Sequence, residues 1–277
     1  SPETALYDGM PQAAIDSGNA DEIGTIGEIC ASIAEHAKRM DNGDQQEFGQ
    51  ADLNSVIALI KARLGLDFSA YKQGTIGRRI RRRLKLLRFE KLSDYLGHLR
   101  SDANELRQLA DDMLINVTSF FRDDTIWDEV VAKVVTPLVE AAGSGPLRIW
   151  VPGCASGEEA YTLAILFEEH CAQQEHPCDW QIFASDLDVD AISQGREGLY
   201  PNSISADVSE ERLQQFFRRE DNHFRVHKRL RERVVFAHQD ILHDPPFSRL
   251  DLVSCRNLLI YLDAAHQRQL MDTFHFA

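Results

Sequence analysis

The segment at residues 153–161, Gly-Cys-Ala-Ser-Gly-Glu-Glu-Ala-Tyr, joins small residues to two adjacent glutamates. Small residues at a turn between a strand and a helix allow a ligand to approach the backbone closely. A phosphate site would favour Gly-x-Gly-x-x-Gly without these acids, because carboxylates near a helix N-terminus repel a phosphate. Gly153 and Glu159 therefore suit a cationic ligand that lacks phosphate, such as S-adenosylmethionine with its sulfonium. A tight turn whose acids only stabilise the helix start is an equal alternative.

Two more acids follow apolar runs further along the chain. Asp186 comes after the run 180–184, where a carboxylate could accept hydrogen bonds from both hydroxyls of a ribose. Taken alone, Asp186 would more often cap the next helix. Asp240 comes after the run 234–237 and could bind an adenine amino group, with Ile241 against the ring. The alternative for Asp240 is a loop acid that begins a turn.

A third candidate is the segment 116–123, Asn-Val-Thr-Ser-Phe-Phe-Arg-Asp, which precedes the apolar runs. Asn116, Thr118 and Arg122 could converge on a carboxylate, and the two phenylalanines between them would exclude water. A polar linker held by two core phenylalanines explains the segment equally well.

The elements expected to position these residues belong to a largely parallel sheet. Apolar runs at 147–151, 180–184, 234–237 and 250–254 indicate strands, with helical segments between several of them. This order is typical of a doubly wound α/β domain, whose ligands bind beyond the carboxyl ends of the strands. Ahead of it, the segment 52–111 has apolar residues at three- and four-residue steps, which predicts a small all-helical unit.

The composition of the 277-residue chain restricts its function class. No apolar run reaches the roughly 20 residues that cross a bilayer, and the start has no secretory signal, so no membrane insertion is expected. The net charge of −14 argues against nucleic-acid binding, although seven of the eleven residues at 78–88 are Arg or Lys. The cysteines show neither Cys-x-x-Cys nor metal-ligand spacing, so we expect reduced thiols in a cytoplasmic protein and no metal site.

Four segments, in this order along the chain, resemble the chemotaxis receptor methyltransferases, the CheR family. They lie at 116–123, 153–161, 183–188 (Phe-Ala-Ser-Asp-Leu-Asp) and 255–262 (Cys-Arg-Asn-Leu-Leu-Ile-Tyr-Leu), and the resemblance covers about residues 50–277. It implies a protein-glutamate O-methyltransferase that modifies methyl-accepting chemotaxis receptors, with S-adenosylmethionine as methyl donor and S-adenosylhomocysteine as product. The implied fold is a Rossmann-like α/β methyltransferase domain with a small antiparallel insertion between residues 201 and 236. A small all-helical N-terminal domain precedes it.

The resemblance also assigns roles to single residues. Arg122 and Tyr261 are expected at the methyl-transfer centre, where Arg122 orients the acceptor carboxylate, although Tyr261 could instead be a core aromatic. An ionised glutamate needs no general base, so catalysis would come from alignment and exclusion of water. The residues expected to line the cofactor pocket are Asn116, Thr118, Arg122, Gly153, Glu159, Asp186, Asp240, Ile241, Arg256 and Asn257.

The family resemblance predicts a function for the basic segment 78–88. On a helix, Ile80, Leu84 and Leu87 share one face, which leaves the arginines to cover the rest. Receptor methylation helices are rich in glutamate, so a basic surface would steer and hold them. A solvated charged face is the alternative. The residues expected to bind the receptor are Arg78, Arg79, Arg82 and Arg83.

Both ends of the chain differ from the family pattern. Residues 7–15 resemble the last segment of a chemotaxis methylesterase (CheB) domain, which suggests an excised part of a methylesterase–methyltransferase fusion that also carries sensory modules. We expect residues 1–45 to be that tail and a linker, 46–126 the all-helical domain and 127–277 the cofactor-binding domain. The family continues beyond residue 277 with a turn and two strands, so a C-terminally truncated domain of reduced stability is expected.

Two other functions are compatible with the same residues. One is a non-catalytic S-adenosylmethionine-binding sensor or docking module in a multidomain signalling protein. The other is an RNA methyltransferase that uses the helix at 78–88, which the acidic remainder of the chain argues against. Finally, the stretch 218–224 lacks the long Gly-rich loop of receptor-tethered members, which predicts a tether-independent enzyme.

Overall fold

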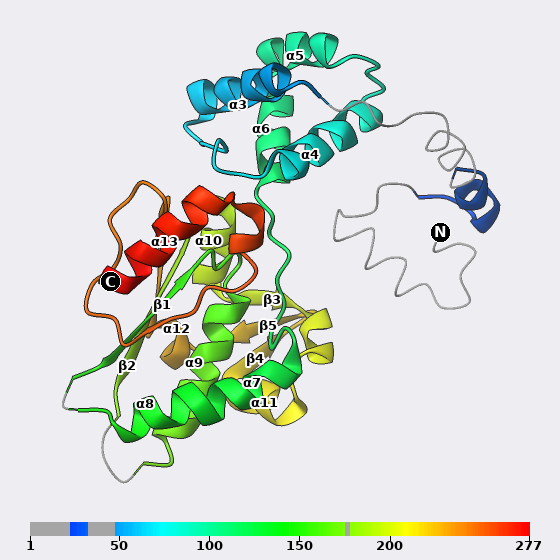
Figure 1. The fold of residues 1–277 in the computed structure, drawn as a ribbon. Helices are drawn as coiled ribbons and strands as arrows, with labels where there is room; N and C mark the ends of the chain where they lie inside the picture. The colour runs from blue at the N-terminus through cyan, green and yellow to red at the C-terminus, as the bar shows by residue number, and fades with distance from the viewer. Residues whose placement is uncertain (1–22, 33–47, 144, 175–177) are drawn as a thin grey trace. The chain divides into compact units, whose positions relative to one another are not determined.

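The computed structural model describes residues 23–32, 48–143, 145–174 and 178–277 (Figure 1). The methylesterase-like segment expected at 7–15 lies outside these residues. The chain divides into two compact units, Ser1–Gly49 and Gln50–Ala277, and the second contains both the helical and the α/β elements. Among the described residues, no helix has the length and apolar character needed to cross a membrane.

Four helices form the predicted all-helical part of the second unit. They are α3 (Gln50–Leu64), α4 (Gln73–Leu86), α5 (Leu92–Ser101) and α6 (Ala103–Met113). Apolar residues at helical spacing form their core, and Val56 and Ile60 of α3 are fully buried. Helix α6 begins after Asp102, whose carboxylate accepts hydrogen bonds from the backbone N–H groups of Asn104 and Glu105.

A parallel four-stranded sheet forms the predicted α/β domain. Its strands are β1 (Leu147–Pro152), β2 (Trp180–Asp186), β6 (Val234–His238) and β7 (Leu252–Val253), in the order β6-β2-β1-β7. Strands β1 and β2 are in register up to Pro152 opposite Ser185. Their carboxyl ends therefore stop side by side, next to two of the segments predicted to bind the ligand.

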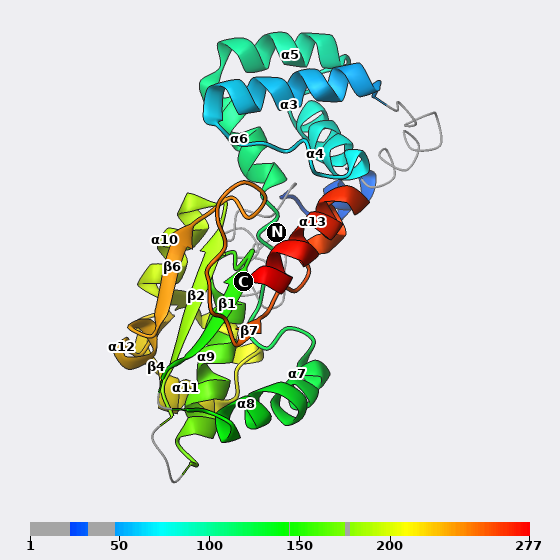
Figure 2. The same cartoon turned by 60° about the vertical axis from the view of Figure 1, so that its left-hand side comes forward.

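Helices cover both faces of this sheet (Figure 2). On one face lie α9 (Glu158–Cys171), α10 (Val189–Glu197) and a continuous helical run. That run consists of α7 (Asp124–Val130), the π-helix η2 (Val131–Val135) and α8 (Thr136–Glu140). On the opposite face lies α13 (Ala264–Phe276).

Alternation along β1 explains how both faces are filled. Ile149 and Val151 are buried in the core that contains α9. Trp150 points to the other side, where its ring lies 5.4 Å from that of Phe274 in α13. A strand buried on both faces must be apolar throughout, which is why 147–151 has no polar alternation apart from one arginine.

A small antiparallel sheet lies between α10 and β6, as predicted. Its strands β3 (Leu199–Pro201), β4 (Phe217–Glu220) and β5 (His223–Val226) have the order β3-β5-β4. The 3-10 helix η3 (Asn202–Ala206) and α11 (Glu210–Phe216) connect β3 to β4, and α12 (Lys228–Arg231) leads to β6. The turn between β4 and β5 has two residues, and the first, Asp221, has a φ of 49° as such short turns require.

Two expectations from the sequence are corrected here. Leu87 does not share the buried face of Ile80 and Leu84, because α4 ends one residue earlier and Leu87 is 36% exposed. The Sγ atoms of Cys171 and Cys178 are bonded to each other, so these two thiols are not reduced. Only a few residues join α9 to β2, which brings the two Cα atoms to 5.3 Å, a separation that a disulfide spans.

Candidate functional site

One pocket lies at the carboxyl ends of β1, β2 and β6. It contains about 1120 Å³ of empty space, its open mouth included. All the residues predicted to line the cofactor pocket line this one, and so does Tyr261. The structure therefore brings residues from five separate parts of the sequence into one site. They are Asn116, Thr118 and Arg122; Gly153 and Glu159; Asp186; Asp240 and Ile241; and Arg256 and Asn257.

The turn between β1 and α9 exposes its backbone to the pocket. Gly153, Ala155 and Gly157 have positive φ values of 67°, 47° and 95°. At Gly157 a Cβ atom would lie 2.7 Å from the Phe236 ring, so only glycine fits there. The Ala155 N–H donates to Asp186 Oδ2 at 2.8 Å. Asp186 therefore holds the turn as well as lining the pocket.

Two half-buried carboxylates, those of Glu159 and Asp186, line this pocket. Burial is the largest influence on each, and it raises the pKa of both above the ordinary values. Ser254 Oγ donates to Glu159 Oε1 at 2.6 Å, but neither carboxylate forms an ion pair with another described side chain. Arg256 and Arg122 lower the pKa of Glu159, but by less than burial raises it, so a cationic ligand would stabilise this carboxylate further.

The loop 116–123 forms a further wall. Its two phenylalanines are buried, and the Phe121 N–H donates to a threonine hydroxyl of α9 at 3.1 Å. Arg122 Nη1 donates to a carbonyl of the same loop at 2.8 Å. Asn116 Nδ2 donates to Asp188 Oδ2 at 2.5 Å. The loop is thus fixed both to α9 and to the segment that follows β2.

Arg256 lines the pocket, but its guanidinium holds the loop. Its Nη2 donates to Arg122 O and to Asp123 Oδ2, both at 2.9 Å. The guanidinium also lies 4.8 Å from the centroid of the Trp127 ring, and the Trp127 indole donates to Arg122 O at 3.0 Å. Arg256 therefore holds the loop of Arg122 through Nη2, and it also lines the pocket as predicted; its contact with the cofactor stays a prediction.

The Asp240 carboxylate holds the loop after β6. Its Oδ1 accepts from the Leu242 N–H at 3.0 Å, and its Oδ2 lies 2.9 Å from His243 Nδ1. These contacts agree with the alternative in which this acid begins a turn. Asp240 and Ile241 also line the pocket, so their contacts with an adenine stay a prediction.

The helical part contributes two pocket residues that the sequence did not reveal, Asp67 and Tyr71. Burial raises the pKa of the Tyr71 phenol, and the carboxylates of Asp186 and Asp240 raise it further. The phenol therefore stays protonated beside these acids, as a hydrogen-bond donor. Tyr71 belongs to no recognisable motif, and only its place just before the basic helix marks it.

A backbone clamp, formed by residues 70–72 and 260–263, joins the helical part to the segment of Tyr261. The N–H of Lys72 donates to Tyr261 O at 2.8 Å, and the N–H of Asp263 donates to Ala70 O at 3.0 Å. Lys72 Nζ donates to the carbonyl of residue 260 at 2.8 Å. The clamp holds the 3-10 helix η4 (Leu259–Tyr261), and Tyr261 is half-buried at the pocket, not a fully buried core aromatic.

Helix α4 carries the basic segment, and its buried face is apolar. Ile76, Ile80 and Leu84 are buried, whereas Arg78 and Arg82 are exposed and Arg79 is half-buried. The predicted basic surface is therefore present at these three arginines.

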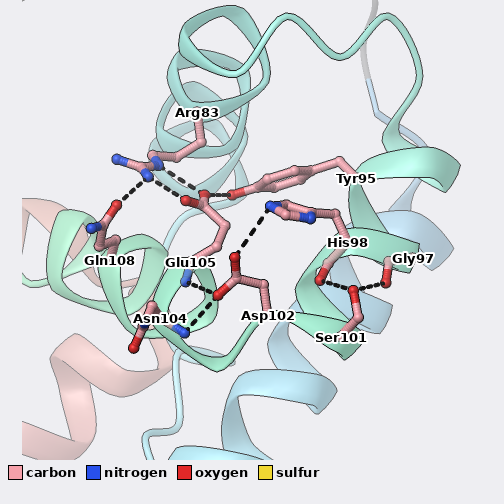
Figure 3. A network of polar contacts seen from close by, with 9 residues as sticks. All are labelled: Arg83, Tyr95, Gly97, His98, Ser101, Asp102, Asn104, Glu105 and Gln108. Carbon is pink, nitrogen blue, oxygen red and sulfur yellow. Dashed lines mark hydrogen bonds and ion pairs between the residues drawn. The ribbon is translucent and has the colours of Figure 1, made fainter.

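Arg83 does not belong to that surface. Its guanidinium is bonded to both carboxylate oxygens of Glu105, through Nε at 2.9 Å and through Nη2 (Figure 3). Tyr95 Oη donates to the same carboxylate at 2.6 Å. Glu105 thus connects α4, α5 and α6, and we remove Arg83 from the predicted receptor-binding set because its charge is used inside the helical part.

Two family profiles match adjoining parts of the chain. One, described as the all-alpha domain of CheR methyltransferases, matches residues 51–114, and the other, their SAM-binding domain, matches residues 116–277.

Individual relatives agree. An uncharacterized 104.1 kDa protein of Rhodobacter capsulatus is 36% identical over 303 residues, which cover 100% of this chain and 32% of that protein. A chemotaxis protein methyltransferase of Listeria monocytogenes is 30% identical over 216 residues, covering 78% of this chain and 80% of the relative. The Escherichia coli chemotaxis protein methyltransferase is 27% identical over 237 residues, with 81% and 78% covered. The chain thus spans about a third of the first relative and about four fifths of the other two. It belongs to the CheR methyltransferase family, and residues 116–277 are that family's S-adenosylmethionine-binding domain.

Proposed function

We propose that this chain transfers the methyl group of S-adenosylmethionine to glutamate side chains of chemotaxis receptors in the cytoplasm, which forms methyl esters. The observation that carries the proposal is the pair of half-buried carboxylates, Glu159 and Asp186, which line one pocket and whose pKa values burial raises, that of Glu159 despite the nearby Arg256 and Arg122. The chemotaxis methyltransferases among the relatives support the receptor as substrate.

The residues of the pocket fit this cofactor. S-adenosylmethionine supplies an activated methyl group on a positively charged sulfur, and its amino-acid part carries an ammonium group. Glu159, at the start of α9, would neutralise positive charge, while Asp186 at the end of β2 would accept hydrogen bonds from the ribose. Tyr71 offers a donor near Asp186, and Ile241 offers an apolar contact for the adenine.

Methyl transfer to a carboxylate requires positioning more than proton transfer. An ionised glutamate already has a nucleophilic lone pair, so the chain must align it with the donor and exclude water. Arg122 and Tyr261 line the same pocket and would hold the acceptor carboxylate, the first through charge-assisted hydrogen bonds and the second through its hydroxyl. The bond of Arg122 to its own loop uses one of five N–H groups, which leaves donors for the acceptor.

Receptor recognition is assigned to the exposed side of α4. Arg78, Arg79 and Arg82 present positive charge there in a chain of net charge −14. Such a local surface attracts acidic helices over distances of about 10 Å at moderate salt. We also propose that methylesterase and sensory modules of one parent protein act beside this chain, because residues 7–15 resemble the end of a methylesterase domain.

Calorimetric titration with S-adenosylhomocysteine, followed by methyl transfer to receptor cytoplasmic fragments, tests the proposal. We expect saturable binding of the product and base-labile methyl esters on the receptor. Binding without transfer would instead support a non-catalytic sensor or docking module. Absence of product binding contradicts the proposal.

The role of Arg122 can be separated from cofactor binding. Arg122→Ala should lower the rate of methyl transfer about 100-fold because the acceptor loses its alignment. The affinity for S-adenosylhomocysteine should change less than about threefold, since the loss of one half-buried hydrogen-bonding group has a small net effect. Equal losses in rate and affinity would show that Arg122 only holds the cofactor.

A further inference from the structure

Tyr200 of β3 is a fully buried residue that contacts two walls of the pocket from behind. It does not line the pocket, and its exposed fraction is 0%. Its hydroxyl donates to Ser156 O at 2.7 Å, in the turn between β1 and α9. Its ring lies edge-on to Phe120 of the loop 116–123, with 4.9 Å between ring centroids. One side chain thus reaches both of these pocket-forming backbone segments.

The turn needs such support because its backbone is strained. Ala155 has a φ of 47°, a region that residues with a side chain rarely adopt. The next residue, Ser156, is buried, so its carbonyl requires a hydrogen-bond donor from the protein. Burial raises the pKa of Tyr200 well above its ordinary value, and the hydroxyl therefore remains a donor at any physiological pH.

The loop that carries Arg122 depends on the same residue. Phe120 is 1% exposed and precedes Arg122 by two positions. Its ring is in edge-on contact with Tyr200 of β3 and with Phe217 of β4, the latter at 5.5 Å between centroids. The antiparallel sheet therefore supplies the aromatic socket (Tyr200 and Phe217) in which the loop is seated.

We propose that Tyr200 is a positioning residue for methyl transfer. Its hydroxyl fixes the turn between β1 and α9, which lines the cofactor pocket, and its ring fixes the position of the loop 116–123, which carries Arg122. This inference rests on the proposed function and goes beyond it, because it makes the antiparallel sheet part of the scaffold of the reacting groups. Two separable effects follow. Loss of the hydroxyl affects cofactor affinity, and loss of the ring affects the rate at saturating cofactor.

Tyr161 provides a matched control for the hydroxyl. It is also 0% exposed and lies in the same core, but its hydroxyl donates to Gly195 O at 2.8 Å, away from the turn. Tyr200→Phe and Tyr161→Phe each remove one buried hydrogen bond and keep the ring, so both should lower the melting temperature by similar amounts.

The affinity for S-adenosylhomocysteine, measured by calorimetry on the full chain, should separate the two variants. We expect a fall of about fivefold for Tyr200→Phe, the net value of one neutral hydrogen bond, and less than about twofold for Tyr161→Phe. Equal losses in both variants, or no loss in Tyr200→Phe, overturn the inference. Absence of binding by the unsubstituted chain would contradict the proposed function itself, so the two failures are distinct.

The ring is tested by Tyr200→Leu against Phe224→Leu. Phe224 is buried in the same sheet, but its ring contacts Phe217 at 6.5 Å and has no ring contact with Phe120. We expect kcat at saturating S-adenosylmethionine to fall about tenfold in Tyr200→Leu and about twofold in Phe224→Leu, because misplacing Arg122 acts on the reacting geometry. Equal kcat values would overturn the role of the ring. If Tyr200→Leu does not fold, Phe120→Leu tests the same contact from the other side.

Discussion

Buried carboxylates occur in two regions of this chain, and their surroundings are opposite. In the helical part, Glu105 is 5% exposed and is bonded to Arg83 and Tyr95, which join three helices (Figure 3). At the sheet, Glu159 and Asp186 are half-buried at the pocket, form no direct ion pair with a described side chain, and have raised pKa values. The first acid has a directly bonded counter-charge, whereas Arg256 and Arg122 act on Glu159 only from a distance.

The difference separates an acid that joins helices from two acids that face a ligand pocket. A buried ion pair resists the loss of either partner, because the remaining charge stays uncompensated. A buried carboxylate without a partner lowers the stability of the free protein and gains from a cationic ligand. The two regions should therefore respond in opposite ways to the same substitution of glutamate by glutamine.

The largest expected effect is on the stability of the helical part. Glu105→Gln should destabilise the chain by about 3 kcal/mol in urea unfolding, because Arg83 then has a buried charge without its main partner. Its affinity for S-adenosylhomocysteine should be unchanged under folding conditions. Lys61→Gln is the control: it breaks the ion pair with Asp67, in which Lys61 is 61% exposed, and should change stability by less than about 1 kcal/mol. A loss for Glu105→Gln no larger than this control would remove the contrast between the two regions.

Glu159→Gln should show the reverse pattern. We expect about a fiftyfold loss of affinity for S-adenosylhomocysteine, since a charge-assisted hydrogen bond is replaced by a neutral one. The melting temperature of the free chain should stay the same or rise, because a buried charge is removed. Glu158→Gln is a close control, as Glu158 is buried next to it but is held by Ser156 Oγ and does not line the pocket. Its affinity should change less than about twofold, and a similar loss in both variants would argue against a specific role of Glu159.

The ionisation of Glu159 should affect the stability of the chain and its affinity for the cofactor in opposite directions as the pH changes. Since the folded-state pKa of Glu159 lies above its ordinary value of 4.5, the folded chain binds this proton more readily than the unfolded chain. Its contribution to stability is therefore present at low pH and lost as the pH rises through the raised pKa. Cofactor binding needs the carboxylate, so affinity should fall about tenfold as the pH drops through that same pKa. Calorimetry from pH 8 downward, compared with Glu159→Gln, checks this, and parallel curves for both proteins would assign the dependence to other groups.

The smallest expected effect concerns Tyr71, which brings the helical part into the pocket. Tyr71→Ala should weaken the binding of S-adenosylhomocysteine about fivefold, because the ring and a protonated donor beside Asp186 are lost. Phe68, whose ring packs on Tyr71 at 5.2 Å but does not line the pocket, provides the control Phe68→Leu. Equal affinities for Tyr71→Ala and the unsubstituted chain would restrict cofactor binding to the sheet.

Much of the fold and most of the pocket could be predicted from the sequence. Apolar runs that end in polar residues located the strands, and a parallel sheet then places those ends at one edge. That rule brought Gly153, Asp186 and Ile241 together although they lie far apart in the chain. The small antiparallel sheet, which the family resemblance implied, was also predicted correctly.

The partners of several side chains could not be predicted, because a sequence pattern locates a residue on an element but does not say which other residues it contacts. Asp240 and Arg256 lie at the pocket as expected, and the sequence did not reveal that each also forms hydrogen bonds to neighbouring loop residues. Arg83 has the same sequence character as Arg82, and only the packing of α4 against α6 decides which of them meets Glu105. The pairing of Cys171 with Cys178 depends likewise on how the chain returns from α9 to β2.

The backbone clamp has a mechanical consequence. Main-chain hydrogen bonds tie residues 70–72, at the start of the arginine-bearing helix, to residues 261–263. A tilt of that helix when an acidic receptor segment binds would be transmitted through these bonds to the Tyr261 backbone. Binding of the receptor at the arginines would then be coupled to the position of Tyr261 at the pocket. Receptor fragments too short to reach the arginines should therefore be poor substrates even at saturating concentration.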